Sequence, residues 1–153
     1  MTKRRLPPLL RRAWFSLNQA FRQHLAPLGI TPDQFTILRW LVEADAHGLT
    51  QVEITVCMAS DPNTITATVR RMESAGLLER VPHETDGRSK RVRALPRGRE
   101  VFEEGASLAL DLQGRVLGCL STEEAATFLE LLERVSEACA QAGPAGTKRS
   151  LGS

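Results

Sequence analysis

A polar helix face in the middle of the chain carries residue types with which proteins read DNA. Asp61 and Pro62 form a typical helix start, and Ile65, Val69 and Met72 would form the buried stripe of that helix. Short side chains with hydroxyl, amide or methyl groups suit base edges, and arginines reach phosphates or guanine. We therefore predict that this helix enters the major groove. The side chains left to face the DNA are Asn63, Thr64, Thr66, Ala67, Arg70 and Arg71.

A basic hairpin follows this helix and offers a second surface for nucleic acid. Leu77–Val81 and Lys90–Leu95 are predicted as its strands, with an Asp-Gly turn signal between them. Arg88 falls at the tip, where an arginine can enter a narrow minor groove with concentrated negative potential. We expect Asp86 to pair with an arginine and hold the loop in shape. The bases that would neutralise phosphates beside the tip are Lys90, Arg91 and Arg93.

A further helix is predicted directly before the polar one. Residues from Thr50 to Glu53 form a capping box that opens a short helix ending near Met58. Thr50 and Gln51 would lie at its N-terminus, where free amides and the helix dipole favour a phosphate. The order of elements over residues 50–95 predicts a helix-turn-helix followed by a β-wing.

Amphipathic helices are predicted on both sides of this piece. Apolar residues recur every three or four positions between Leu10 and Leu25. A capping box at residues 31–34 opens a helix that should end at Gly48, a natural left-handed C-terminal residue. A long helix follows Pro96, and a last one begins at a capping box led by Ser121. The predicted fold class is mainly α with a small β-wing.

Composition limits the class of protein. The chain has 153 residues and 16.9 kDa, about one domain, with 42% hydrophobic and 25% charged residues. No apolar run is long enough for a membrane span or a signal-peptide core, so we expect a cytoplasmic protein that does not contact membranes. The net charge of +2 conceals segregation, because residues 61–99 carry nine bases and five acids and residues 100–139 carry nine acids and two bases. Such asymmetry suggests one part that faces a polyanion, although solvated helix faces would give the same pattern.

The residue inventory favours neither catalysis nor a metal centre. The three histidines are scattered and the cysteines lack a CxxC spacing. Candidate nucleophiles have no histidine in a recognisable motif, and no glycine-rich phosphate loop occurs. We therefore expect no enzyme activity, no metal and no cofactor. Cys57 is interpreted as a buried small hydrophobe, and Cys119 and Cys139 fall in the C-terminal helices.

Five stretches of the chain together form a recognisable pattern: Gly48 to Glu53, Asn63 to Thr66, Arg71 to Arg80, Asp86 to Ser89 and Leu95 to Gly98. Through them, residues 35–98 resemble the winged helix-turn-helix of the MarR family of bacterial transcription regulators, and the resemblance extends over about residues 9–140. The Asp-x-Arg wing with a leucine and glycine at this distance is its most specific part. Pro96 departs from the family pattern, which usually has a threonine there to cap the long helix.

The resemblance implies a division of the chain and a set of partners. It implies a first dimerisation helix at 9–30, a DNA-binding lobe at 31–95 and C-terminal dimerisation helices at 96–142. Composition alone predicts a flexible basic arm at 1–8 and a disordered tail, rich in glycine, serine and small residues, at 143–153. The homodimer would bind a near-palindromic duplex and act as a repressor. A small ligand, often an aromatic acid or phenol, would bind between the dimer helices and the DNA-binding lobe and so release the repressor from DNA.

Several alternatives stay open at this point. Candidate ligand contacts are Arg12, Trp14, Leu17, His24 and Trp40, although core packing is the preferred interpretation of both tryptophans and a surface or interface position that of His24. The wing and helices could serve as a protein-interaction module without DNA binding. A thiol-based, redox-responsive regulator is a further alternative.

Overall fold

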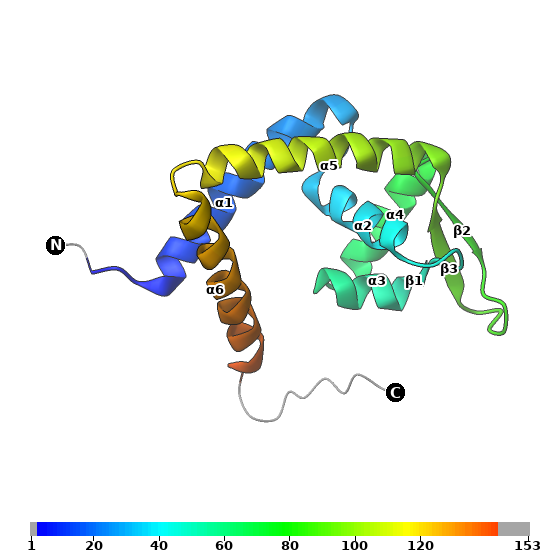
Figure 1. Ribbon diagram of the computed structural model, residues 1–153. Coiled ribbons are helices and arrows are strands. Elements are labelled where there is room, and N and C mark those ends of the chain that lie inside the picture. The colour runs from blue at the N-terminus through cyan, green and yellow to red at the C-terminus, as the bar shows by residue number, and fades with distance from the viewer. Residues whose placement is uncertain (1–2, 144–153) are drawn as a thin grey trace. The chain divides into compact units, whose positions relative to one another are not determined.

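The computed structural model describes residues 3–143 and confirms the predicted fold class of helices with a small sheet (Figure 1). Of the described residues, 3–112 form one compact unit and 113–143 form another. The chain runs through α1 (Leu6–Leu25), a short 3-10 helix (Ala26–Leu28), α2 (Pro32–Glu43), β1 (Leu49–Thr50), α3 (Gln51–Met58), α4 (Pro62–Ser74), β2 (Leu78–Pro82), β3 (Lys90–Ala94), α5 (Pro96–Leu117) and α6 (Thr122–Gln141).

Helix α1 begins earlier than the sequence pattern indicated. Residues 6–8, expected within the flexible arm, are helical. The physical reason is that proline is preorganised for the first helical positions, which Pro7 and Pro8 occupy or adjoin. The tail predicted at 143–153 lies outside the described residues from position 144 onward.

All three predicted capping boxes form. Thr31 and Gln34 exchange bonds of 3.1 and 3.2 Å at the start of α2. The Thr50–Glu53 pair does the same on α3 at 2.7 and 3.2 Å, and Ser121 begins α6 in the same way. Each box satisfies two backbone amides that the helix itself leaves without an acceptor. The capping signals therefore fix where these helices start.

The sheet contains a strand that the sequence pattern did not predict. Its order is β1-β3-β2 with both pairs antiparallel, so β3 is central. Val92 pairs with Leu49 on one side and with Arg80 on the other, and its side chain is fully buried. Through β1 the wing is joined directly to the start of α3.

The core of the first unit joins α1, α2, α5 and the helix-turn-helix. Phe35 packs edge-on against Phe21 at 5.1 Å between ring centroids and stacks on Phe102 at 5.4 Å. Gly105 makes room for the Phe35 ring, since a Cβ there would lie 2.8 Å from it. Other fully buried members include Leu25, Leu38, Ile54, Val69 and Met72. This core holds α4 and the sheet in fixed positions.

Helix α2 ends at Glu43, not at Gly48 as expected, and Gly48 instead turns the chain into β1 with a φ of 77°.

No described helix is both long and apolar enough to cross a membrane.

Gly48 is predicted to tolerate no side chain. A Cβ at this position would lie 2.1 Å from the carbonyl oxygen of Val92, whereas at Gly29, with a φ of 73°, it would meet nothing within 4 Å. Gly29→Ala should therefore lower the free energy of unfolding by the left-handed strain alone, roughly 1–2 kcal/mol. Gly48→Ala should lower it by about 2 kcal/mol or more beyond that. Urea unfolding of both variants measures the difference. Equal losses would contradict the close approach of Gly48 to β3.

Candidate nucleic-acid interface

Helix α4 presents the polar face that the sequence predicts. Ile65, Val69 and Met72 are buried in the core, which turns the opposite side of the helix outward. Ala67 and Thr66 are half-buried at the edge of that side. The exposed members of the predicted base-reading set are Asn63, Thr64, Arg70 and Arg71. The helix thus offers an amide, a hydroxyl and two guanidinium groups on one surface.

The first turn of α4 is tied to its N-cap. Asp61 accepts one bond from the backbone amide of Thr64 at 2.9 Å and another from the hydroxyl of Thr64 at 2.5 Å. These two bonds lower the pKa of the Asp61 carboxyl below its usual value. The hydroxyl hydrogen of Thr64 is occupied in this arrangement. Thr64 therefore offers a ligand its methyl group and its oxygen lone pairs, but no donor.

A side-chain bond joins the two helices of the helix-turn-helix. Gln51, on α3, donates from Nε2 to the hydroxyl oxygen of Thr66, on α4, at 2.5 Å. The same Thr66 hydroxyl donates to the carbonyl of Pro62 at 2.8 Å. Thr66 is thus fixed by two bonds, and Gln51 is turned toward the α4 surface. Both residues sit together, although they stand 15 positions apart in the chain.

Thr50 caps the N-terminus of α3, as the sequence predicts. Its side chain accepts from the amide of Glu53, and its own amide donates to the Glu53 carboxylate. That carboxylate lies at the same helix end where a phosphate was expected. The phosphate contact at Thr50 stays a prediction.

The wing tip is organised by backbone bonds and not by the ion pair expected of Asp86. Within residues 3–143 Asp86 has no salt bridge. Its Oδ1 instead accepts from the backbone amide of Arg88 at 3.0 Å, and its carbonyl accepts from Ser89 at 3.1 Å. Short acidic side chains commonly close turns in this way. Arg88 itself is exposed, as its predicted role requires.

Arg91 is held within the wing, although it was expected at the phosphates. Its Nε and Nη2 donate to the two Glu84 oxygens at 3.0 and 2.9 Å, and Nη1 reaches the carbonyl of Gly48 at 3.4 Å. The bonds from Arg91 hold the pKa of Glu84 at about 2, and Glu84 raises the pKa of Arg91. Lys90 is exposed beside this pair. Arg91 therefore stabilises the wing by a bidentate pair, and its phosphate contact stays a prediction.

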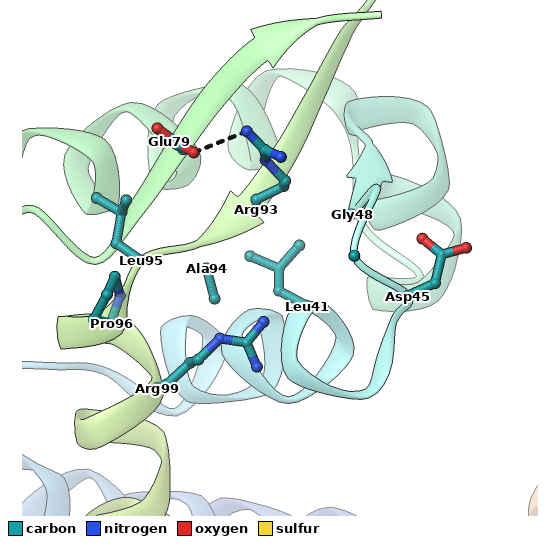
Figure 2. Close-up of a pocket in the computed structure, with 10 residues that line it drawn as sticks. Leu41, Asp45, Gly48, Glu79, Arg93, Ala94, Leu95, Pro96 and Arg99 are labelled. Atoms are coloured by element: carbon teal, nitrogen blue, oxygen red, sulfur yellow. Dashed lines mark hydrogen bonds and ion pairs between the residues drawn. The ribbon is translucent and has the colours of Figure 1, made fainter. Parts of the chain in front are cut away.

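A small cavity lies behind the wing, within the first unit (Figure 2). Its volume is about 290 Å³, and Leu41 and Ala94 contribute apolar surface. Arg93 on its wall pairs with Glu79 at 3.1 Å, while Arg93 Nε is buried without a hydrogen-bond partner among the described residues. The other lining residues are Asp45, Ala46, Gly48, Leu95, Pro96 and Arg99. Two arginines face two carboxylates here, so formal charges cancel.

The residues predicted to contact a small ligand lie elsewhere. Trp14 is 67% exposed and Trp40 is 38% exposed, so in this chain the expected core packing of both is wrong. Arg12 and Leu17 are exposed on α1, and His24 Nδ1 lies 2.8 Å from the carbonyl of Ala20 in the preceding turn. None of the five lines the cavity behind the wing. Their role as ligand contacts stays a prediction.

The thiols and possible metal ligands complete the inventory. Cys57 is exposed, which corrects the expected burial, because Ile54 alone on α3 is fully buried. Cys119 and Cys139 are exposed as well. Within residues 3–143 no three His, Cys, Asp or Glu side chains gather in a group that could hold a metal ion.

The chain is similar in sequence and in fold to known transcription regulators. A model of the MarR family matches residues 28–89. The transcriptional repressor Rv2887 of Mycobacterium tuberculosis is 28% identical over 127 residues, 83% of this chain and 90% of the relative. A probable transcriptional regulator from Pseudomonas aeruginosa is 31% identical, with a TM-score of 0.75, covering 83% of this chain and 93% of that one. A MarR variant from Escherichia coli, solved with operator DNA, is 28% identical, with a TM-score of 0.76, covering 84% and 91%.

A winged helix-turn-helix with an exposed polar recognition helix defines a class, the DNA-binding transcription regulators. Within that class the chain belongs to the MarR family.

The Gln51–Thr66 bond is predicted to stabilise the helix-turn-helix. Thr66→Val keeps the shape of the side chain but removes the hydroxyl that Gln51 contacts. Thr68→Val is the matched control, since the Thr68 hydroxyl bonds only the carbonyl of Thr64 at 2.9 Å. We expect Thr66→Val to lower the free energy of unfolding by about 1 kcal/mol more than Thr68→Val, measured by urea unfolding. Equal effects would show that the bond between the helices contributes nothing.

Proposed function

We propose that this chain is a homodimeric transcription repressor that reads a near-palindromic DNA duplex and is released by a small ligand. The carrying observation is the exposed polar face of α4 together with Arg88 at the wing tip. With α4 in the major groove, Asn63 and Arg70 approach base edges or phosphates, and Arg88 approaches the minor groove. A repressor among the relatives supports repression of transcription as the mode of regulation.

The homodimer is supported by apolar side chains that the single chain leaves uncovered. Helix α6 has no buried residue, and Phe128 and Leu131 are 45% and 48% exposed on it. On α1, Trp14 and Phe15 are 67% and 63% exposed. Large apolar surfaces of this kind are normally covered by another protein surface. A second copy of the chain is the occupant that we propose, and it would give the two-fold symmetry that a near-palindrome requires.

The ligand part of the proposal names an acidic aromatic or phenolic molecule. It is supported by the family membership and by the predicted contacts of Arg12, Trp14, Leu17, His24 and Trp40. A ligand weakens DNA binding only by the factor by which it binds one conformation more tightly than the other. The favoured conformation must be the one whose lobe spacing does not fit the duplex. About one helical turn, roughly 34 Å, separates the two half-sites that the recognition helices must reach together.

Arg88→Ala is predicted to weaken DNA binding by about 1–3 kcal/mol, because it removes the guanidinium group that we place in the minor groove. Arg22→Ala is the matched control, since it removes an exposed cation from α1. Fluorescence anisotropy with the DNA upstream of the chain's own gene, over a salt series, gives both affinities. Equal affinities for Arg88→Ala and wild type would refute the wing contact, and no salt-sensitive binding by the folded protein would favour a protein-interaction module.

Leu131→Glu is predicted to separate the dimer, since it places a carboxylate in the apolar surface of α6. Glu130→Gln changes an exposed neighbour on the same helix and should leave the assembly intact. Sedimentation velocity should give twice the 16.9 kDa chain mass for the wild type and for the control, and the single mass for Leu131→Glu. A wild-type monomer that stays single at all concentrations would refute the homodimer.

A further inference from the structure

Helix α4 carries three threonines, and the hydroxyl hydrogen of each is bound within the protein. The Thr64 hydroxyl donates to the Asp61 carboxylate at 2.5 Å. The Thr66 hydroxyl donates to the carbonyl of Pro62 at 2.8 Å. The Thr68 hydroxyl donates to the carbonyl of Thr64 at 2.9 Å. Since a threonine hydroxyl has one hydrogen to give, none of the three offers a donor to a base.

Asp61 holds the Thr64 side chain in one orientation. Its carboxylate accepts the backbone amide of Thr64 at 2.9 Å as well as the hydroxyl. These bonds lower the pKa of Asp61, so the carboxylate is ionised at neutral pH and is a stronger acceptor than a neutral base edge. With Oγ1 turned toward Asp61, rotation about the Cα–Cβ bond of Thr64 is restricted and the methyl group points away from the carboxylate. The group that Thr64 leaves free for a partner is therefore its methyl group.

The Thr64 methyl group begins an apolar strip along the outer side of α4. Residues three and four positions apart are neighbours on a helix surface, which places Ala67 and Thr68 beside Thr64. Thr64 is exposed, and the other two residues are half-buried. Ala67 has a methyl group and no polar side-chain atom, and the hydroxyl of Thr68 is bound to the backbone. These three residues form the methyl strip, which the exposed Arg71 follows on the same side of the helix.

Thymine is the base that matches the methyl strip. Of the four DNA bases, it alone presents a methyl group in the major groove. Apolar groups that meet there are removed from water, which favours the contact. The acceptor atoms of guanine, adenine and thymine need a donor, and the bound hydroxyls of α4 supply none. The methyl strip therefore favours thymine over the other bases.

We propose that the Thr64 methyl group, with Ala67 beside it, contacts the methyl group of one thymine in each DNA half-site, and that Asp61 is the positioning residue for this contact. The proposal deepens the function above and rests on the placement of α4 in the major groove. It adds the base that the first turn of the helix selects. Because the hydroxyl is bound and the methyl group is free, the two parts of the Thr64 side chain have separate tasks, one toward Asp61 and one toward the DNA.

The orientation of Thr64 is measured on the full chain without DNA. Three-bond NMR couplings from its methyl carbon to the backbone nitrogen and carbonyl carbon should report a single rotamer. Asp61→Ser keeps an N-cap oxygen for the Thr64 amide but has no second oxygen for the hydroxyl, so its couplings should average over several rotamers. Averaged couplings in the wild type, or unchanged couplings in Asp61→Ser, would overturn the positioning role of Asp61 even if the chain binds DNA.

Uracil isolates the base contact, since it differs from thymine only by lacking the methyl group. Footprinting first locates the bound segment in the DNA upstream of the chain's own gene, and each thymine there is then replaced in turn by deoxyuridine. At one thymine in each half-site the Kd should rise about fourfold, the factor that corresponds to one buried methyl group. Salt-sensitive binding that ignores every replacement would overturn the proposal and leave the proposed function intact. No binding by the folded chain would refute that function itself.

Substitutions separate the methyl group from the hydroxyl, with the Kd on the uracil duplex divided by that on the thymine duplex as the readout. Thr64→Ser removes the methyl group and keeps the hydroxyl, so this ratio should fall to about one. Thr64→Val keeps a methyl group and should keep the wild-type ratio, as should Thr68→Ser, the matched control one turn further along α4. In Asp61→Ser, where Thr64 can rotate, the ratio should fall to about twofold.

The outcomes for the Thr64 variants decide which part of the side chain reads the DNA. An unchanged ratio in Thr64→Ser would overturn the thymine contact. If Thr64→Val also bound the thymine duplex more weakly than Thr64→Ser, the oxygen of Thr64 would be the reading group, by accepting from the amino group of adenine or cytosine.

Discussion

The pairing of Leu49 and Thr50 with β3 is the interaction on which the DNA-binding lobe depends. Two residues of β1 hold Val92 and Arg91, and the very next residue begins α3. From α3 the Gln51 side chain reaches Thr66 on α4. The wing, α3 and α4 are therefore connected in series by the β1–β3 pairing and the Gln51–Thr66 hydrogen bond. Gly48 makes the pairing possible, since any Cβ there would meet the carbonyl of Val92.

The electrostatic surface that remains for DNA is smaller than the charge count suggests. Arg80, Arg91, Arg93 and Arg97 are engaged in ion pairs with Glu73, Glu84, Glu79 and Glu100. In the described part of the chain, the cations of residues 61–99 outside such pairs are Arg70, Arg71, Arg88, Lys90 and Arg99. Exposed pairs add little stability, yet they direct which arginines face a partner. The excess of basic residues in the sequence thus indicates where the DNA-binding lobe lies. The ion pairs then determine which of its cations stay available to a partner.

Periodicity and capping chemistry predicted most of the fold because they act over three or four residues. The buried stripe of α4 and the capping boxes at Thr31, Thr50 and Ser121 follow from such local rules. Strand β1 could not be found in this way, because two residues show no alternation. The partner of Arg91, the backbone role of Asp86 and the exposure of Cys57 also depend on contacts between segments. The Gln51–Thr66 bond left no sequence signal beyond the polar type of both residues.

The two DNA-facing elements differ in how firmly they are held. Helix α4 is fixed by Ile65, Val69 and Met72, which are buried in the shared core, so its side chains face a partner from a rigid backbone. The wing tip has no apolar anchor of its own, and its shape rests on exposed hydrogen bonds around His83 and Asp86. Exposed bonds of this kind open at low free-energy cost. The helix is therefore suited to reading base edges, which demands fixed geometry, and the wing to following the variable width of a minor groove.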